Sequence, residues 1–164
     1  SVLNRNEVNA EKVIHIRAKQ DLTAENNTLN AHDSQAPWSS NSGAISANNI
    51  IRLISTEGKN VSKNNVISSY GTVRVRADKA LEVNNNSIYG SNYVKLSSNN
   101  DKVTLDNNSV SSYSKINVTA QNGLKLNNNR IVVSDGPLSI TSKKSSVTLT
   151  DNSYIYSSKL KSLR

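Results

Sequence analysis

The sequence predicts an all-β protein, a right-handed parallel β-helix (β-solenoid) of about seven coils. Three observations lead to this fold class. An asparagine-rich turn recurs every 21–23 residues along most of the chain. Each interval holds three short segments in which apolar and polar residues alternate, which is the pattern of β-strands. A single coil has no partner sheet for its apolar face, so the coils must stack on one another to bury it.

The coils follow in order along the chain. The stretch TVRVRADKALEVNNNSIYGSN begins at Thr72 and shows the pattern: the apolar pair Val73/Val75, a polar bend, the pair Leu81/Val83, the asparagine turn and one further apolar residue. Other coils begin at Lys12, Ile51, Tyr93, Lys115 and Pro137, and the segment LNRNEV from Leu3 resembles the end of a preceding coil. With about 4.8 Å between coils, roughly seven of them span about 30–35 Å.

The asparagine runs are expected to form the corners of the coils. Strands avoid Asn, but Asn tolerates the left-handed backbone angles of a sharp turn better than any residue except Gly, and the chain has only six glycines. Stacked corners also let each amide bond the Asn one coil away, which builds a ladder. Asn6 begins the series, and the predicted corners after it are Asn27, Asn65, Asn86, Asn108, Asn129 and Asn152.

Two places break the rhythm. The separation of 38 residues between Asn27 and Asn65 contains an irregular excursion, residues 31–49. Its Pro-Trp and Ser/Asn/Gly cluster favour a protruding loop, with an additional irregular coil turning at Asn48-Asn49 as the alternative. In the coil from Ile51, Asn60 stands where Leu or Val is expected. We therefore predict a solenoid over residues 1–158, followed by a tail over residues 159–164.

Composition limits the possible functions. Hydrophobic residues make up 35% of the chain and Asn plus Ser about a third, yet the alternating Val, Ile and Leu indicate order rather than disorder. The chain has no Cys, which excludes disulfides, thiolate metal sites and a cysteine nucleophile. No apolar run approaches the roughly 18 residues of a membrane span. No signal peptide stands at residue 1, so we expect a segment of a longer protein.

Charge points to a partner. The net charge of +8 favours polyanions, but no basic run interleaved with aromatic residues indicates nucleic acid. In the predicted stack, one outward column on the first strand of each coil reads His15, Arg52, Arg74, Lys95, Asn117, Ser139. The adjacent outward column reads Arg17, Ile54, Arg76, Ser97, Thr119, Thr141.

The cations of these two columns, Arg17, Arg52, Arg74, Arg76 and Lys95, form a candidate binding face for an extended polyanion such as a sulfated or acidic glycan. Like charges opposite each other in neighbouring strands are destabilising, so a chain that keeps them either splays the side chains or uses their field. The alternative is that they are solubilising charges that also discourage pairing at sheet edges.

Other candidate residues give weaker signals. Trp38, in the excursion, is either a contact residue for a partner or an anchor that folds the loop onto the solenoid. A line of tyrosines could stack sugars, but shielding the rim of a thin core is the favoured interpretation. His15 and His32 have no third metal ligand at a sensible spacing. No two acids share a column in adjacent coils, so we predict neither an enzyme nor a metal or cofactor site.

The stretch SKINVTAQNGLKLNNNRIVVSDGPLSITSKKSSVTLTDNS, from Ser114, resembles the repeats of the filamentous haemagglutinin family. These are large exoproteins of two-partner secretion, which include adhesins and contact-dependent growth inhibition proteins. The resemblance covers residues 3–158 in period, strand rhythm and turn type, although Asn and Ser stand here where Gly-Gly or Ala-Gly corners are common in the family.

The resemblance implies a secreted or surface-exposed bacterial protein, exported unfolded through an outer-membrane transporter. Its solenoid would be a shaft that presents, or forms, a binding surface for a receptor or acidic glycan on a host or neighbouring cell. Two alternatives remain from the sequence: a polysaccharide-active enzyme of β-helix fold, and a phage or secretion-system spike.

Overall fold

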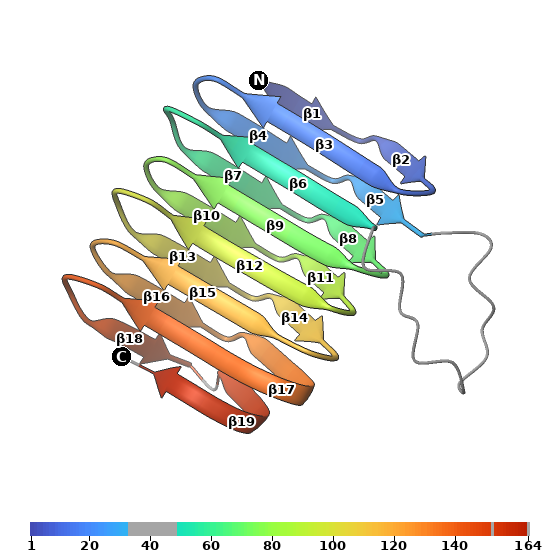
Figure 1. Cartoon of the computed structure of the whole chain (residues 1–164). Coiled ribbons are helices and arrows are strands. Elements are labelled where there is room, and N and C mark those ends of the chain that lie inside the picture. Colours follow the sequence, from blue (N-terminus) through green and yellow to red (C-terminus); the bar gives the residue numbers. More distant parts are fainter. Residues whose placement is uncertain (33–48, 152, 164) are drawn as a thin grey trace.

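The computed structural model describes residues 1–32, 49–151 and 153–163 of the 164-residue chain. Its nineteen strands stack as a β-solenoid, and no helix occurs among the described residues (Figure 1). Accordingly, none of the described residues forms a helix that could cross a membrane. The predicted fold class is confirmed.

Three faces run along the solenoid. Face one is made by β3 (Val13–Ala18), β6 (Ile50–Ser55), β9 (Thr72–Ala77), β12 (Tyr93–Ser98), β15 (Ile116–Ala120) and residues 137–142 of β17 (Arg130–Ser142). Face two is made by β1 (Val2–Asn4), β4 (Leu22–Glu25), β7 (Asn60–Lys63), β10 (Leu81–Asn84), β13 (Val103–Asp106), β16 (Leu124–Asn127) and β18 (Val147–Thr150). Face three is made by β2 (Glu7–Ala10), β5 (Thr28–Ala31), β8 (Val66–Ser69), β11 (Ser87–Gly90), β14 (Ser109–Ser112), the start of β17 and the start of β19 (Tyr154–Leu163).

Every neighbouring pair of strands is parallel, and from β3 to β17 the strands of face one have the predicted register. On face one Val73 pairs with Val94, Val94 with Ile116, and Ile116 with Leu138. In Figure 1 the chain runs along face one in front and returns behind along face two, while it descends from the N-terminus to the C-terminus. This path is right-handed, the hand that parallel crossover connections adopt.

The core is a thin set of apolar columns between the faces. Inward residues of face one, such as Ile51, Leu53 and Val75, have no exposed surface, and those of face two, such as Leu81 and Leu105, are equally buried. The predicted exception is also present. Asn60 lies inward with 0% exposure, and its Nδ2 donates hydrogen bonds to two strand carbonyls, Leu53 O (3.0 Å) and Arg76 O (3.1 Å).

Buried asparagines form the predicted ladder. Asn108 is representative: its backbone N–H and its Nδ2 both donate to Asn129 Oδ1 (3.0 and 2.9 Å), and its Nδ2 also donates to Val83 O (2.7 Å). Its own Oδ1 accepts from the backbone N–H and the Nδ2 of Asn86 (2.9 and 3.2 Å). Both donors and both lone pairs of the amide are thereby used. The same bonds connect Asn6, Asn27, Asn65, Asn86, Asn108 and Asn129.

The residue with the left-handed backbone angle is not the ladder asparagine itself but its neighbour in each corner. The residue just before each ladder asparagine has positive φ, and most of these residues are also Asn, with φ between 48° and 55°. One asparagine therefore makes the turn while the next one bonds the coils. Asn152, the last predicted corner, lies outside the described residues. Among the described residues, the Ser153 hydroxyl accepts a hydrogen bond from the Asn129 backbone N–H (3.2 Å).

The strands on either side of the excursion belong to adjacent coils. β3 pairs directly with β6, and β5 pairs directly with β8, so no further coil separates them. Ala31 completes β5 and Asn49 precedes β6, which places both ends of the predicted excursion at the solenoid itself. Residues 33–48 lie outside the described part of the chain.

The segment predicted as a tail continues the solenoid. Residues 159–163 belong to β19 and pair with β17 on face one, with a register shift between the pairs Leu138/Leu160 and Ser139/Ser162. The shift skips Lys161. Because Leu160 and Leu163 are three residues apart, the period-two alternation is interrupted in the sequence, and a bulge restores the pairing in the structure.

Candidate binding face

Face one brings the predicted cations together. Arg52 pairs with His15 on one side and with Arg74 on the other, and Arg74 pairs with Lys95. In the second column, Ile54 lies between Arg17 and Arg76. Both columns are therefore placed in the order that the repeat predicts, on β3, β6, β9 and β12.

These side chains are exposed to different degrees. Arg17, Arg74 and Arg76 are exposed, while Arg52 and Lys95 are half-buried. The strands that carry them contain no Asp or Glu. The two ion pairs found among the described residues, Lys19–Glu57 and Lys159–Asp135, both 3.9 Å long, lie elsewhere and leave the five cations without a carboxylate partner.

Their spacing concentrates positive potential. Paired residues in neighbouring strands are about 4.8 Å apart, so Arg52, Arg74 and Lys95 repel one another at a cost of a few tenths to about 1 kcal/mol per pair. A polyanion that spans the column relieves this repulsion with every charge it contributes. The arrangement can therefore hold a chain of anionic groups along the solenoid axis.

Acids lie along one edge of the cationic columns. The corners that follow β3, β6, β9 and β12 carry Asp21, Glu57, Asp78 and Asp101 in turn. Three of these carboxylates are engaged locally: Asp21 Oδ1 accepts from the Lys59 backbone N–H (2.8 Å), Glu57 Oε2 accepts from Gln20 Nε2 (3.1 Å), and Asp78 Oδ1 accepts from Asn100 Nδ2 (2.9 Å). Each of these corners also carries a lysine, so the corners are nearly neutral, and the uncompensated positive charge lies on the strands.

After Lys95, the two outward columns continue with uncharged polar residues. Thr119 donates to Asn117 Oδ1 (2.7 Å), and the Ser139 hydroxyl lies 2.6 Å from that of Ser162. Lys115 is a further cation near face one that was not predicted from the sequence. Its Nζ lies 5.1 Å from the centre of the Tyr93 ring. The alignment of KINV with YVKL brings these two residues together, but Lys115 precedes its strand and falls outside the two columns.

The remaining candidates are the two histidines and Trp38, and of these only His15 lies in a cationic column, beside Arg52. His15 is exposed on face one. His32 follows β5 on face three, where its ring stacks on Tyr70, with ring centres 4.1 Å apart. Trp38 lies outside the described residues, so both interpretations of it stay predictions. Within the described ranges, no three His, Asp or Glu side chains come together as a metal site would require.

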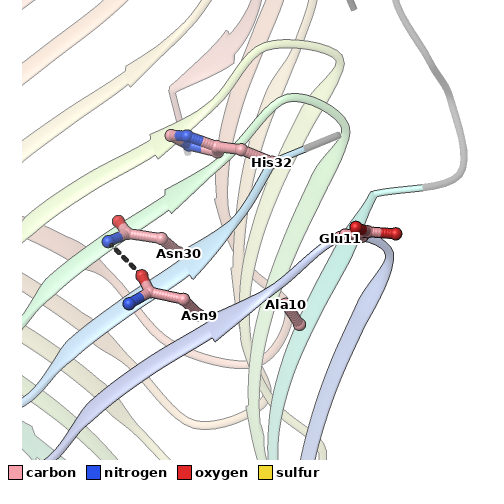
Figure 2. A pocket seen from close by; sticks show the side chains of 5 residues that line it. All are labelled: Asn9, Ala10, Glu11, Asn30 and His32. Atoms are coloured by element: carbon pink, nitrogen blue, oxygen red, sulfur yellow. Dashed lines mark hydrogen bonds between the residues drawn. The ribbon is translucent and has the colours of Figure 1, made fainter. Parts of the chain in front are cut away.

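A second feature, at the N-terminal end of face three, was not identified from the sequence. A hollow of about 270 Å³ is lined by Asn9, Ala10, Glu11, Asn30 and His32. Figure 2 shows Asn9, Asn30 and His32 directed to the same side, with Glu11 directed away from them at the corner. Burial lowers the pKa of His32 from its ordinary value, which favours a neutral ring at pH 7.

Comparison with protein-family models, with curated proteins and with solved structures gives no match.

Proposed function

We propose that this chain is a shaft segment of a secreted or surface-exposed bacterial adhesin or related exoprotein, and that face one binds a polyanionic glycan on a host or neighbouring cell. The observation that carries the proposal is the stacked row Arg52, Arg74 and Lys95, with Arg17 and Arg76 beside it, on strands that contain no acid. An uninterrupted row of cations is the surface that an extended anion needs.

The fold supports the structural part of this proposal. Backbone hydrogen bonds and the asparagine ladder run parallel to the solenoid axis, so each coil is tied to the next at its strands and at its corner. A solenoid of this kind is quasi-one-dimensional and presents an extended surface. Export unfolded through an outer-membrane transporter is part of the proposal, because of the resemblance to two-partner secretion repeats.

The cationic columns also determine how the ligand lies. Successive charges are spaced along the axis, one coil at a time, whereas among the four strands of the two columns only β9 carries two cations, Arg74 and Arg76. A polyanion that meets the largest number of charges therefore crosses the strands and follows the shaft. Binding should accordingly grow with the length of the glycan until the row is covered.

Heparin chromatography tests the proposal. The variant Arg52→Ser/Arg74→Ser/Lys95→Ser should elute from a heparin column at much lower salt than the unmodified protein. The matched control is Lys63→Ser/Lys79→Ser/Lys125→Ser, which removes three exposed cations outside the two columns. Each variant lowers the net charge from +8 by three, to +5, so the overall charge is the same in both. Equal loss of retention in the two variants would show that only net charge matters and would overturn the proposal.

A further inference from the structure

The His32 ring is held in place from two sides. Tyr70 stacks on one face of it, with an angle of 6° between the rings, and His32 Nε2 lies 2.9 Å from the Ser68 hydroxyl. Tyr70 follows β8, one coil further along the axis, and does not line the hollow. The hollow therefore lies on the side of the ring away from Tyr70, towards the coil of Asn9, Ala10 and Glu11. A fixed aromatic ring beside a hollow is a preformed stacking surface.

An amide row lies beside this ring. Asn9 and Asn30 pair in register on β2 and β5, and Asn30 Nδ2 donates to Asn9 Oδ1 (2.9 Å). This bond fixes both carboxamides, yet within the described residues Asn30 Oδ1 and His32 Nδ1 make no hydrogen bond. One N–H of each carboxamide is also unused, because Asn9 Nδ2 donates only to Glu7 Oε1 (3.0 Å). The wall thus offers both acceptors and donors.

The charge of the hollow differs from that of face one. None of its described lining residues is a cation, and Glu11 contributes a carboxylate at the corner. An anionic ligand is therefore disfavoured here. The combination of a fixed ring with unsatisfied amide donors and acceptors matches a sugar, whose C–H face packs on an aromatic ring and whose hydroxyls each donate and accept.

We propose that this hollow is a binding subsite for an uncharged sugar unit, with the His32 ring as the stacking platform and the carboxamides of Asn9 and Asn30 as hydroxyl partners. Ser68 and Tyr70 act as positioning residues for the ring. The subsite is independent of the polyanion face: it lies on a different face of the solenoid and recognises a different class of glycan.

Saturation-transfer-difference NMR on the whole chain tests this proposal. Lactose, cellobiose, maltose and N,N′-diacetylchitobiose, all uncharged, are titrated at pH 7 at millimolar concentration. We expect at least one of them to bind the unmodified protein. His32→Ala and Asn30→Ala should each lower the affinity for that disaccharide about fivefold or more, which corresponds to the loss of one stacking or polar contact. Tyr113→Ala, which removes an exposed aromatic side chain elsewhere on the solenoid, should leave binding unchanged.

Positioning variants separate recognition from folding. Ser68→Ala should lower the affinity for the disaccharide, whereas Ser68→Thr, which keeps the hydroxyl, should retain the affinity of the unmodified protein. Circular dichroism and the urea midpoint show whether each variant is folded, and if His32→Ala does not fold, Asn30→Ala and the Ser68 pair decide. Binding by none of the four disaccharides, or equal weakening in Asn30→Ala and Tyr113→Ala, overturns the proposal. The variant Arg52→Ser/Arg74→Ser/Lys95→Ser leaves the hollow intact. This variant should therefore bind the disaccharide with unchanged affinity even if it no longer binds heparin.

Discussion

The asparagine ladder predicts an unusually large effect for one polar substitution, Asn108→Ala. The side chain of Asn108 makes four hydrogen bonds: two donated by Nδ2, at 2.7 and 2.9 Å, and two accepted by Oδ1, at 2.9 and 3.2 Å. At about 1 kcal/mol each, their loss lowers the free energy of unfolding by about 4 kcal/mol. The Asn86 backbone N–H, left without its acceptor in a buried place, adds about 1–3 kcal/mol more. Few single substitutions outside an apolar core have effects of this size.

The measurement is urea unfolding followed by circular dichroism, with the midpoint and the slope compared between variants. Asn100→Ala is the matched control, because Asn100 is exposed at another corner and its Nδ2 makes one bond, to Asp78 Oδ1 at 2.9 Å. We expect the control substitution to lower the free energy of unfolding by at most about 1 kcal/mol. Asn108→Asp keeps the volume but removes both donors, and should be at least as damaging as Asn108→Ala. If Asn108→Ala and Asn100→Ala have equal midpoints, the ladder does not hold the coils together.

Three further predictions concern other parts of the solenoid. Asn107, with φ of 54°, should tolerate Gly with little change, whereas Asn107→Ala should lower the free energy of unfolding by about 1 kcal/mol in the same urea assay. Asn60→Leu loses the two hydrogen bonds of Asn60 Nδ2, at about 1 kcal/mol each, but it removes the buried Oδ1, which has no hydrogen-bond partner, and continues the apolar column. We expect the gain to exceed the loss and to raise the free energy of unfolding by about 1 kcal/mol; a lower midpoint would contradict this. The lowered pKa of His32 means that the unfolded chain binds the extra proton first, so the melting temperature should fall as pH drops below the ordinary His value of 6.5, and less so in His32→Gln.

Register was predictable because two independent signals agree. A shift of one residue would turn every inward side chain of a strand outward, and the apolar pairs such as Val73/Val75 and Leu81/Val83 leave one register that keeps them inside. The recurring asparagines give the same alignment at the corners. When the period of the apolar pairs and the period of the turns coincide, the position of a residue such as Arg74 above its neighbours follows directly, and with it the order of the cationic columns.

Other features were not predictable for identifiable physical reasons. In the run Asn84-Asn85-Asn86 the residues are chemically identical, so the sequence does not show which one takes the left-handed angle and which one is buried. The strand at residues 159–163 depends on a bulge that the alternation of apolar residues does not reveal. The hollow beside His32 depends on the contacts of that ring with Tyr70 and Ser68, residues 38 and 36 positions away, which no local pattern shows.

The persistence of a like-charged row on face one follows from how this solenoid is stabilised. The register of β6, β9 and β12 is determined by inward apolar columns and by buried asparagines, all of which act away from the outward side chains. Repulsion between Arg52 and Arg74 costs about 1 kcal/mol at most, whereas a single ladder asparagine contributes several times as much. Outward positions therefore vary without risk to the fold. The grouping of five of the twenty cations in two neighbouring columns is therefore not required by the fold, which is why the binding proposal is based on it.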